Sequence, residues 1–143
     1  MTRTLATLLL FFAAGSAHGA PRFIALDVYL NSPDAVAAWQ FELKDLNRSM
    51  SVVGIEDGDS DVFNDAPYYD RNAVNAGAAN RVIVADFSIA CTERLPQGET
   101  RIATIHVMVG DGEPDFDIKL ITATTRDGKR IDASISLREH NGS

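Results

Sequence analysis

Apolar and polar residues alternate along most of the chain from residue 23 onward. The alternation is clearest over 23–31 and again over 39–44, on either side of the turn-forming residues 31–34. A period of two places every second side chain on the same face, which is the pattern of a β-strand with one buried face. The sequence therefore predicts two strands that follow closely on one another at the start of the domain.

Five further strands are predicted downstream, over 50–55, 81–89, 101–109, 116–120 and 131–137. The core of the second of these, 82–85, is apolar on both faces, so we expect that strand to lie centrally in its sheet. The dipeptide Asp127-Gly128 predicts a hairpin turn before the last strand. No segment after the first 20 residues sustains a helical period beyond a turn near 33–38.

Strands that each have a single apolar face must bury those faces against one another. The sequence thus predicts an all-β fold, a jelly-roll-like antiparallel β-sandwich of about seven to nine strands. A closed barrel remains the alternative, because strand spacing alone does not separate the two architectures. The interval 56–80 has no sustained period and carries six acidic residues. It predicts a long loop with one or two short strands, of a kind that is often functional.

The first 20 residues have a different character. One early cation, Arg3, precedes the apolar run 5–14, and small residues dominate 15–20. This order is typical of a secretory signal peptide, because a run of about ten apolar residues falls short of the roughly 20 that a spanning helix needs. We expect a signal peptide over 1–20, a domain over 21–138, a flexible tail over 139–143, and a secreted or periplasmic location.

Composition and charge narrow the class of partner. The chain has 143 residues, 45% of them hydrophobic, which fits one globular domain. Its 13 basic and 20 acidic residues give a formal net charge of −7, which disfavours binding to nucleic acid or to anionic membranes. The single cysteine, Cys91, cannot form an internal disulfide. We expect it to be buried or inert, with pairing between chains as the alternative.

The order of these features resembles the cohesin module, a jelly-roll β-sandwich of the bacterial cellulosome whose fold superfamily includes certain carbohydrate-binding modules. Two segments are similar to the first hairpin of that family, in which a "gxqfxl" strand follows "vdvxl": Leu26-Asp27-Val28-Tyr29-Leu30-Asn31 and Ala38-Trp39-Gln40-Phe41-Glu42-Leu43. The segment 52–58 looks like the next strand with its glycine-bearing exit, and 100–107 and 127–131 look like the last strands. The resemblance implies a non-catalytic recognition module.

Residue types that support catalysis are scarce. Only His106 and His140 follow the expected signal peptide. His106 points away from the apolar set of its strand, and His140 is the fourth residue from the end, so we expect neither to be catalytic. Glycoside hydrolysis would need two carboxyl groups about 5 to 10 Å apart across a cleft, and a compact sandwich has little extra chain to build one. We therefore expect no enzyme and no resident cofactor.

The acidic part of the long loop is the sharpest local signal. Asp57, Asp59 and Asp61 stand at alternate positions and could converge on a hard cation such as calcium. The EF-hand pattern fails, because Val62 stands where the turn glycine is needed and Tyr68 where the bidentate glutamate belongs. A solvated acidic turn is the main expectation, and a calcium site formed by these three aspartates is the alternative.

The aromatic part of the same loop supplies the candidate contact residues, Phe63, Tyr68, Tyr69 and Asp70. Aromatic side chains in a loop either plug the end of a sandwich or present a contact surface. Trp39 instead alternates with polar neighbours on a strand and is expected in the core. We expect an exported recognition module for a protein partner; a carbohydrate-binding module and a structural envelope component that assembles through an exposed sheet edge are the alternatives.

Overall fold

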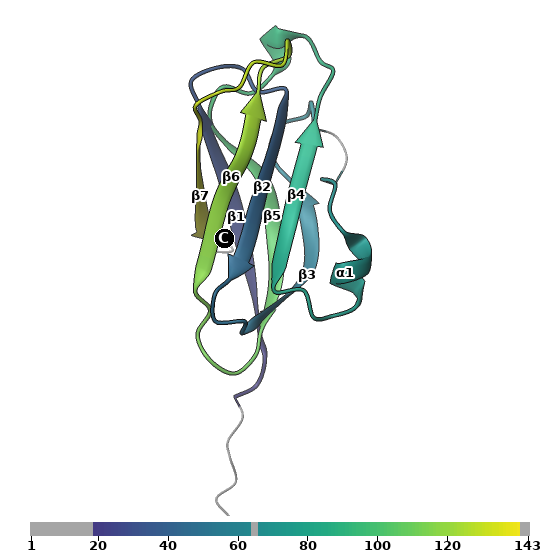
Figure 1. The fold of residues 1–143 in the computed structure, drawn as a ribbon, viewed down its shortest axis with the longest axis vertical. Coiled ribbons are helices and arrows are strands. Elements are labelled where there is room, and N and C mark those ends of the chain that lie inside the picture. Colours follow the sequence, from purple (N-terminus) through teal and green to yellow (C-terminus); the bar gives the residue numbers. More distant parts are fainter. Residues whose placement is uncertain (1–18, 64–65, 141–143) are drawn as a thin grey trace, which may run out of the picture.

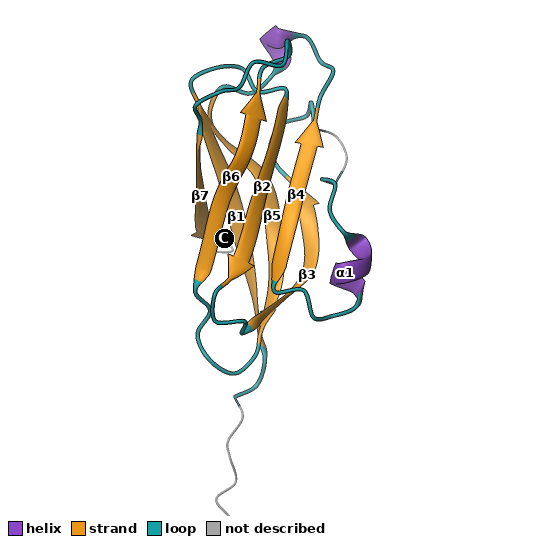
Figure 2. Ribbon diagram, in the orientation of Figure 1, coloured by secondary structure: helices purple, strands orange, loops and turns teal. Residues whose placement is uncertain are grey.

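The computed structural model describes residues 19–63 and 66–140, so almost all of the expected signal peptide and the end of the expected tail lie outside the described residues. Within the described residues, seven strands form two antiparallel sheets that pack face to face (Figures 1 and 2). Helix is confined there to α1 (Arg71–Asn75) and a short 3-10 turn at Thr92–Arg94. The prediction of an all-β fold built from two packed sheets is confirmed.

The larger sheet has the strand order β3-β5-β1-β7 and the smaller one the order β4-β2-β6. The strands of the larger sheet are β1 (Arg22–Ser32), β3 (Met50–Asp57), β5 (Gly98–Val109) and β7 (Ser134–Glu139). Those of the smaller sheet are β2 (Ala38–Asp45), β4 (Arg81–Phe87) and β6 (Phe116–Thr124). Each strand overlaps one of the seven predicted runs, because a period of two is a direct consequence of the pleat.

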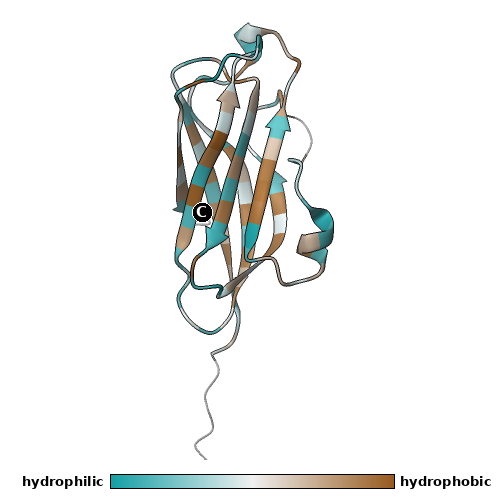
Figure 3. Ribbon diagram, in the orientation of Figure 1, coloured by the Kyte–Doolittle hydropathy of each residue, from teal (hydrophilic) through white to brown (hydrophobic). Residues whose placement is uncertain are grey.

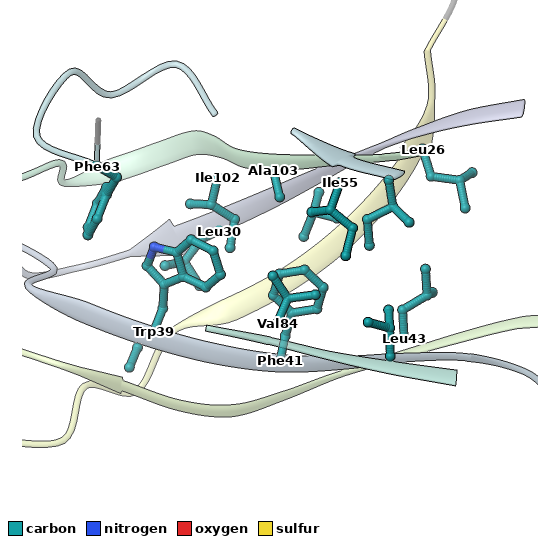
Figure 4. Close-up of a cluster of buried hydrophobic side chains, with 14 of the residues drawn as sticks. Leu26, Leu30, Trp39, Phe41, Leu43, Ile55, Phe63, Val84, Ile102 and Ala103 are labelled. Atoms are coloured by element: carbon teal, nitrogen blue, oxygen red, sulfur yellow. The ribbon is translucent and has the colours of Figure 1, made fainter. Parts of the chain in front are cut away.

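The core lies between the two sheets, where apolar side chains from both inner faces meet (Figure 4). Apolar and polar positions alternate along the strands in Figure 3, as the pleat requires. Trp39 is buried; its ring lies 5.6 Å from that of Phe41 and 6.1 Å, edge-on, from that of Phe63. The prediction that Trp39 belongs to the core is confirmed.

Strand β4 lies at an edge of the smaller sheet, so its predicted central position is wrong. The segment between β3 and β4 covers part of that edge: the Tyr68 N–H donates to the Ala85 carbonyl oxygen (2.8 Å), and the Ala85 N–H donates to the Tyr68 carbonyl oxygen (3.0 Å). Helix α1 follows in the same segment and contacts β3 (Figure 1). The segment therefore satisfies part of the backbone edge of β4, while the apolar outer side chains Ile83 and Ala85 remain half-buried.

The turn at Asp127-Gly128 forms as predicted, with Gly128 at a φ of 82° and the Thr125 N–H donating to the Lys129 carbonyl oxygen (2.9 Å). The strand that returns from this turn pairs with β6 only briefly, through the Ile131 N–H and the Ala123 carbonyl oxygen (2.8 Å). The chain then crosses to the larger sheet, where β7 pairs with β1. The hairpin is therefore local, and its second arm is not β7.

Three smaller expectations are also corrected. The helical turn near 33–38 does not form, whereas the helix α1 arises in the segment that was expected to be irregular. Cys91 is exposed, so it is not the buried thiol that the sequence predicted as one possibility, whereas its inertness stays a prediction. The tail begins later than residue 139, because β7 includes Glu139 and the His140 N–H donates to the Ala25 carbonyl oxygen (2.8 Å). Among the described residues, no helix is long and apolar enough to span a membrane.

Candidate functional site

Two aromatic rings lie together on the outer face of the smaller sheet. Tyr68 and Phe87 have ring centroids 6.0 Å apart and planes only 8° from parallel. Both side chains are exposed, Tyr68 by 62% and Phe87 by 58%, and Ile89, two residues after Phe87, is 86% exposed. Large apolar side chains that remain together in water mark a surface prepared for contact. We call Tyr68, Phe87 and Ile89 the aromatic patch.

Backbone pairing sets the position of this patch. Because Tyr68 forms an antiparallel bridge with Ala85, its side chain lies on the same face of the sheet as that of Ala85. Phe87 lies two residues further along β4 and therefore shares this outer face. The segment that covers the β4 edge thus also places the Tyr68 ring beside Phe87.

The rows of the outer face next to the aromatic patch carry mainly short and uncharged polar side chains. The cross-strand pairing of β4, β2 and β6 puts Ala85 in one row with two polar residues, Gln40 and Thr122. It puts Phe87 in the next row with Ala38 and Thr124. Short side chains, hydroxyl groups and one amide therefore form a shelf beside the rings with hydrogen-bonding capacity. Arg130, which forms an antiparallel bridge with Thr124, ends the second row with a charged side chain.

The other half of the same face is charged. Glu42 on β2 forms an ion pair and a hydrogen bond with Arg81 on β4. Lys44 lies 3.9 Å from Glu42 and 3.3 Å from Asp117 on β6. Opposite charges pair with one another across three strands here. The face therefore divides into an aromatic half with mainly uncharged neighbours, bordered by Arg130, and a half whose charges pair with one another.

The other predicted contact residues have structural roles. Phe63 is buried against Trp39, which is the plugging alternative for that residue (Figure 4). Tyr69 is half-buried against the core, with the Arg71 guanidinium 4.9 Å from its ring centroid. Asp70 caps α1, since its carboxylate accepts a hydrogen bond from the Ala73 N–H (3.0 Å). Of the four residues, the structure brings only Tyr68 into the aromatic patch.

Sequence reasoning missed Phe87 and Ile89. Phe87 shares the outward parity of Ile83 and Ala85, so the alternation of β4 contains the signal that it faces away from the core. The signal was overlooked because a strand apolar on both faces suggested a central position covered by neighbours. The cover is supplied by Tyr68, whose pairing with β4 has no counterpart in the sequence pattern.

The three aspartates of the acidic loop do not converge. The Asp59 carboxylate accepts hydrogen bonds from Arg101 Nε (3.1 Å) and Nη2 (2.6 Å), whereas Asp61 lies 3.2 Å from Arg94 Nη2. At Asp57 it is the backbone carbonyl that accepts from Arg101 (3.2 Å). No group of three or more metal-ligating side chains gathers in the parts of the chain that the structure describes. The calcium alternative therefore gains no support from these positions.

A second polar cluster lies on the outer face of the larger sheet. The buried Asp27 carboxylate accepts a hydrogen bond from the Thr104 hydroxyl (2.6 Å) and lies 2.8 Å from His140 Nδ1. Thr104 in turn accepts from Arg101 Nη1 (2.6 Å). Burial raises the pKa of Asp27, but the hydrogen bonds from Thr104 and His140 and the nearby charges outweigh it, so the pKa is lower than usual.

This arrangement ties strands together rather than presenting a nucleophile. Asp27 stands between Thr104 and His140, so the imidazole does not contact the hydroxyl that it would have to activate. The other histidine, His106, is partly exposed, with Nε2 3.1 Å from the Glu56 carboxylate. Both histidines thus lie on an outer face beside a carboxylate, and Asp27 is the one that links its strand to its neighbours.

No protein-family model, curated protein or solved structure matches the chain.

Proposed function

We propose that the chain is a non-catalytic recognition module that binds a protein partner through the aromatic patch. The single observation that carries this proposal is the pair of exposed, nearly parallel rings of Tyr68 and Phe87. Aromatic side chains dominate the energetically important positions of protein interfaces. The hydroxyl and amide groups of the shelf would need hydrogen-bond partners on contact, whereas the charged half of the face and Arg130 would form the polar rim.

A protein is favoured over a polysaccharide because of how the rings are arranged. Each ring shields one face of the other, and Ile89 extends the exposed apolar surface with an aliphatic side chain. Ring edges and an isoleucine suit interdigitation with apolar side chains of a partner. A sugar would instead stack on an open ring face.

A polysaccharide is the second candidate, and a specific observation supports it. Gln40, Thr122 and Thr124 lie beside the rings and could hydrogen-bond sugar hydroxyl groups. The combination of aromatic rings with uncharged polar side chains is suited to ligands rich in hydroxyl groups.

The finer class of the fold and the location belong to the same proposal. We place the sandwich with the jelly-roll modules of cohesin type, because the segments that carry the resemblance, 26–31, 38–43 and 52–58, form the bulk of β1, β2 and β3. We place the protein in the periplasm or outside the cell, because residues 1–20 have the pattern of a signal peptide.

The test compares variants of the patch against a matched control. The purified protein is immobilised and exposed to envelope and secreted fractions of the source cells, and any captured protein is then purified. Its dissociation constant is measured for the natural chain, for Tyr68→Ala/Phe87→Ala and for Phe23→Ala. Phe23 is the control because it is a 72% exposed phenylalanine on the other sheet. A polysaccharide array is probed in parallel with the same three proteins.

We expect the double variant to bind the captured protein at least about thirtyfold more weakly and Phe23→Ala to bind it normally. Equal binding by the double variant and the natural chain would overturn the assignment of the patch. Loss of polysaccharide binding in the double variant, with no effect on any protein partner, would establish the second candidate instead.

A further inference from the structure

The two lateral sides of the sandwich differ. On one side, the segment between β3 and β4 covers part of both strand edges: the Val52 N–H donates to the Ala79 carbonyl oxygen (2.8 Å), and Tyr68 pairs with Ala85. On the other side, β6 and β7 are the outermost strands of their sheets. Half-buried apolar side chains line that open side: Phe116, Ile118, Leu120, Ile135 and Leu137.

The pairing of β2 shows which backbone groups of β6 are free. The N–H and C=O groups of Ala85 point away from β2, because they bond to Tyr68. Hydrogen-bonded and non-bonded pairs alternate in antiparallel sheets. Gln40, opposite Ala85, therefore directs its backbone groups toward β6, and so do Glu42 and Lys44 two and four residues on. Their partners on β6, Lys119 and Asp117, thus bond to β2. The remaining residues of this stretch direct their backbone groups outward: Phe116, Ile118 and Leu120.

The far end of β6 is already occupied. The Ala123 carbonyl oxygen accepts from the Ile131 N–H (2.8 Å), and the Ile121 carbonyl oxygen accepts from Arg130 Nη2 (3.0 Å). The open stretch is therefore 116–120, which reads Phe-Asp-Ile-Lys-Leu. An acid and a base stand at equal distances on either side of a central isoleucine, so this stretch is self-complementary when it is reversed.

We propose that this stretch pairs with the same stretch of a second copy, antiparallel about a two-fold axis at Ile118. In this register Asp117 faces the partner's Lys119, and Lys119 faces the partner's Asp117. Phe116 faces the partner's Leu120 on the inner side of the sheet. The outward backbone groups are in phase with this pairing, because they belong to Phe116, Ile118 and Leu120 in both copies.

Among the strand edges that the structure describes, those of β3 and β4 are partly covered, as described above. Symmetric pairing of β7 about Leu137 would place Glu139 against an isoleucine and Arg138 against a serine, so neither charge is matched. At β6 the opposed charges are attractive, and Asp117 remains 48% exposed although it lies 3.3 Å from Lys44.

The distribution of charge also favours this edge. Residues 116–140 carry five basic and four acidic side chains, whereas the chain as a whole has a net charge of −7. Two copies of an acidic protein repel one another at long range, and this repulsion is smallest where the local charges balance. The contact extends over only five residues per copy, so we expect weak association.

Dimerisation in this way would join the smaller sheets into one sheet with the order β4-β2-β6-β6-β2-β4. The two aromatic patches would then lie on the same face, about 24 Å apart across the strands. Because the patch row lies four to five residues from the Ile118 row, the two-fold axis also separates them by about 30 Å along the strands, so they would be roughly 40 Å apart. Two linked sites bind a repetitive partner more tightly than one. The dimer itself does not depend on what the aromatic patch binds, so the two proposals are tested separately.

The test is sedimentation equilibrium of the purified protein from about 10 µM to about 1 mM. The variants Lys119→Asp and Asp117→Lys each place like charges opposite one another, and each should weaken association at least about tenfold. An equimolar mixture of the two variants restores opposite charges across the contact and should dimerise. Arg71→Asp on α1, at the partly covered side of the sandwich, is the control with the same change in charge as Lys119→Asp.

Concentration-dependent dimers in the natural chain and the control, their loss in each single variant and their return in the mixture would establish the contact. Slowed amide exchange at Ile118 and Leu120 with rising concentration would place it at the β6 backbone. A natural chain that stays monomeric at about 1 mM would overturn the proposal. Dimers that persist unchanged in both single variants would overturn it as well, since another surface would then be responsible.

Discussion

Asp45 at the end of β2 holds three parts of the chain together through one buried carboxylate. One of its oxygens accepts from the backbone N–H groups of Asn47 (3.0 Å) and Asp115 (2.8 Å). The other accepts from the N–H of Ser49 (2.6 Å), the hydroxyl of Ser49 (2.9 Å) and the N–H of Met50 (2.9 Å). The carboxylate thus joins the β2–β3 turn to the loop that precedes β6.

Removing this carboxylate should therefore be costly. Hydrogen bonds to a charged group contribute about 1.5 to 3 kcal/mol each, but the losses do not add, because water can reach several of the donors. We expect Asp45→Ala to lower the free energy of unfolding by about 3 to 5 kcal/mol. We expect Asp45→Asn to lower it by about 2 to 3 kcal/mol, because either orientation of the amide sets its NH₂ group against backbone donors.

Acid should remove the same contribution from the natural chain. Burial raises the pKa of Asp45, but the hydrogen bonds from Asp115, Ser49 and Asn47 outweigh it and hold the pKa below its ordinary value. Because the folded-state pKa is lowered, the stabilisation is present above about pH 4 and is lost as the pH falls through the folded-state value. The difference between the natural chain and Asp45→Asn should therefore shrink toward low pH.

Urea unfolding followed by the fluorescence of Trp39, the single tryptophan, measures these differences. The exposed Asp132→Asn serves as the control and should change the free energy of unfolding by less than about 0.5 kcal/mol. An Asp45→Asn variant as stable as this control at pH 7 would refute the reasoning. So would a difference that stays constant from pH 7 to pH 3.

Two further substitutions test the packing of the domain. Gly58→Ala would place a Cβ 2.0 Å from the carbonyl oxygen of Arg101, so we expect a loss of at least about 3 kcal/mol in urea unfolding, whereas Gly54→Ala, with no atom within 4 Å, should be nearly neutral. Phe63→Ala should cost about 3 to 5 kcal/mol and shift the emission of Trp39, because it opens a cavity beside that ring. A loss below about 1 kcal/mol would contradict the placement of Phe63 in the core.

The sequence predicted the strands well, because the alternation of apolar and polar residues within each strand shows which of its side chains are buried. Each strand has one buried face, so alternation identifies it whatever its neighbours are. Alternation says nothing about neighbours in the sheet, and the error at β4 follows from this. Its outer residues Ile83 and Ala85 suggested a central strand, but the cover comes from a segment that is distant along the sequence.

The candidate site was only partly predictable for a related reason. The loop that holds Phe63, Tyr68, Tyr69 and Asp70 was identified from its aromatic residues, yet composition does not tell which ring is buried. Phe63 fills the core and Asp70 caps a helix, so Tyr68 alone of the four reaches the patch. Phe87 became part of the site only because pairing with Ala85 brings Tyr68 beside it.

The backbone of Tyr68 contributes to folding, whereas its side chain is available for recognition. Its backbone N–H and C=O groups close the β4 edge, whereas its side chain lies in water beside Phe87. Truncation of the ring leaves both backbone bonds intact, so a Tyr68→Ala chain should keep the edge covered and lose only contact surface. At β6 the backbone itself forms the proposed contact with a second copy, and the charged side chains of Asp117 and Lys119 select its register. The β4 edge, which Tyr68 pairs with, therefore offers side chains to a partner, whereas the open β6 edge offers its backbone.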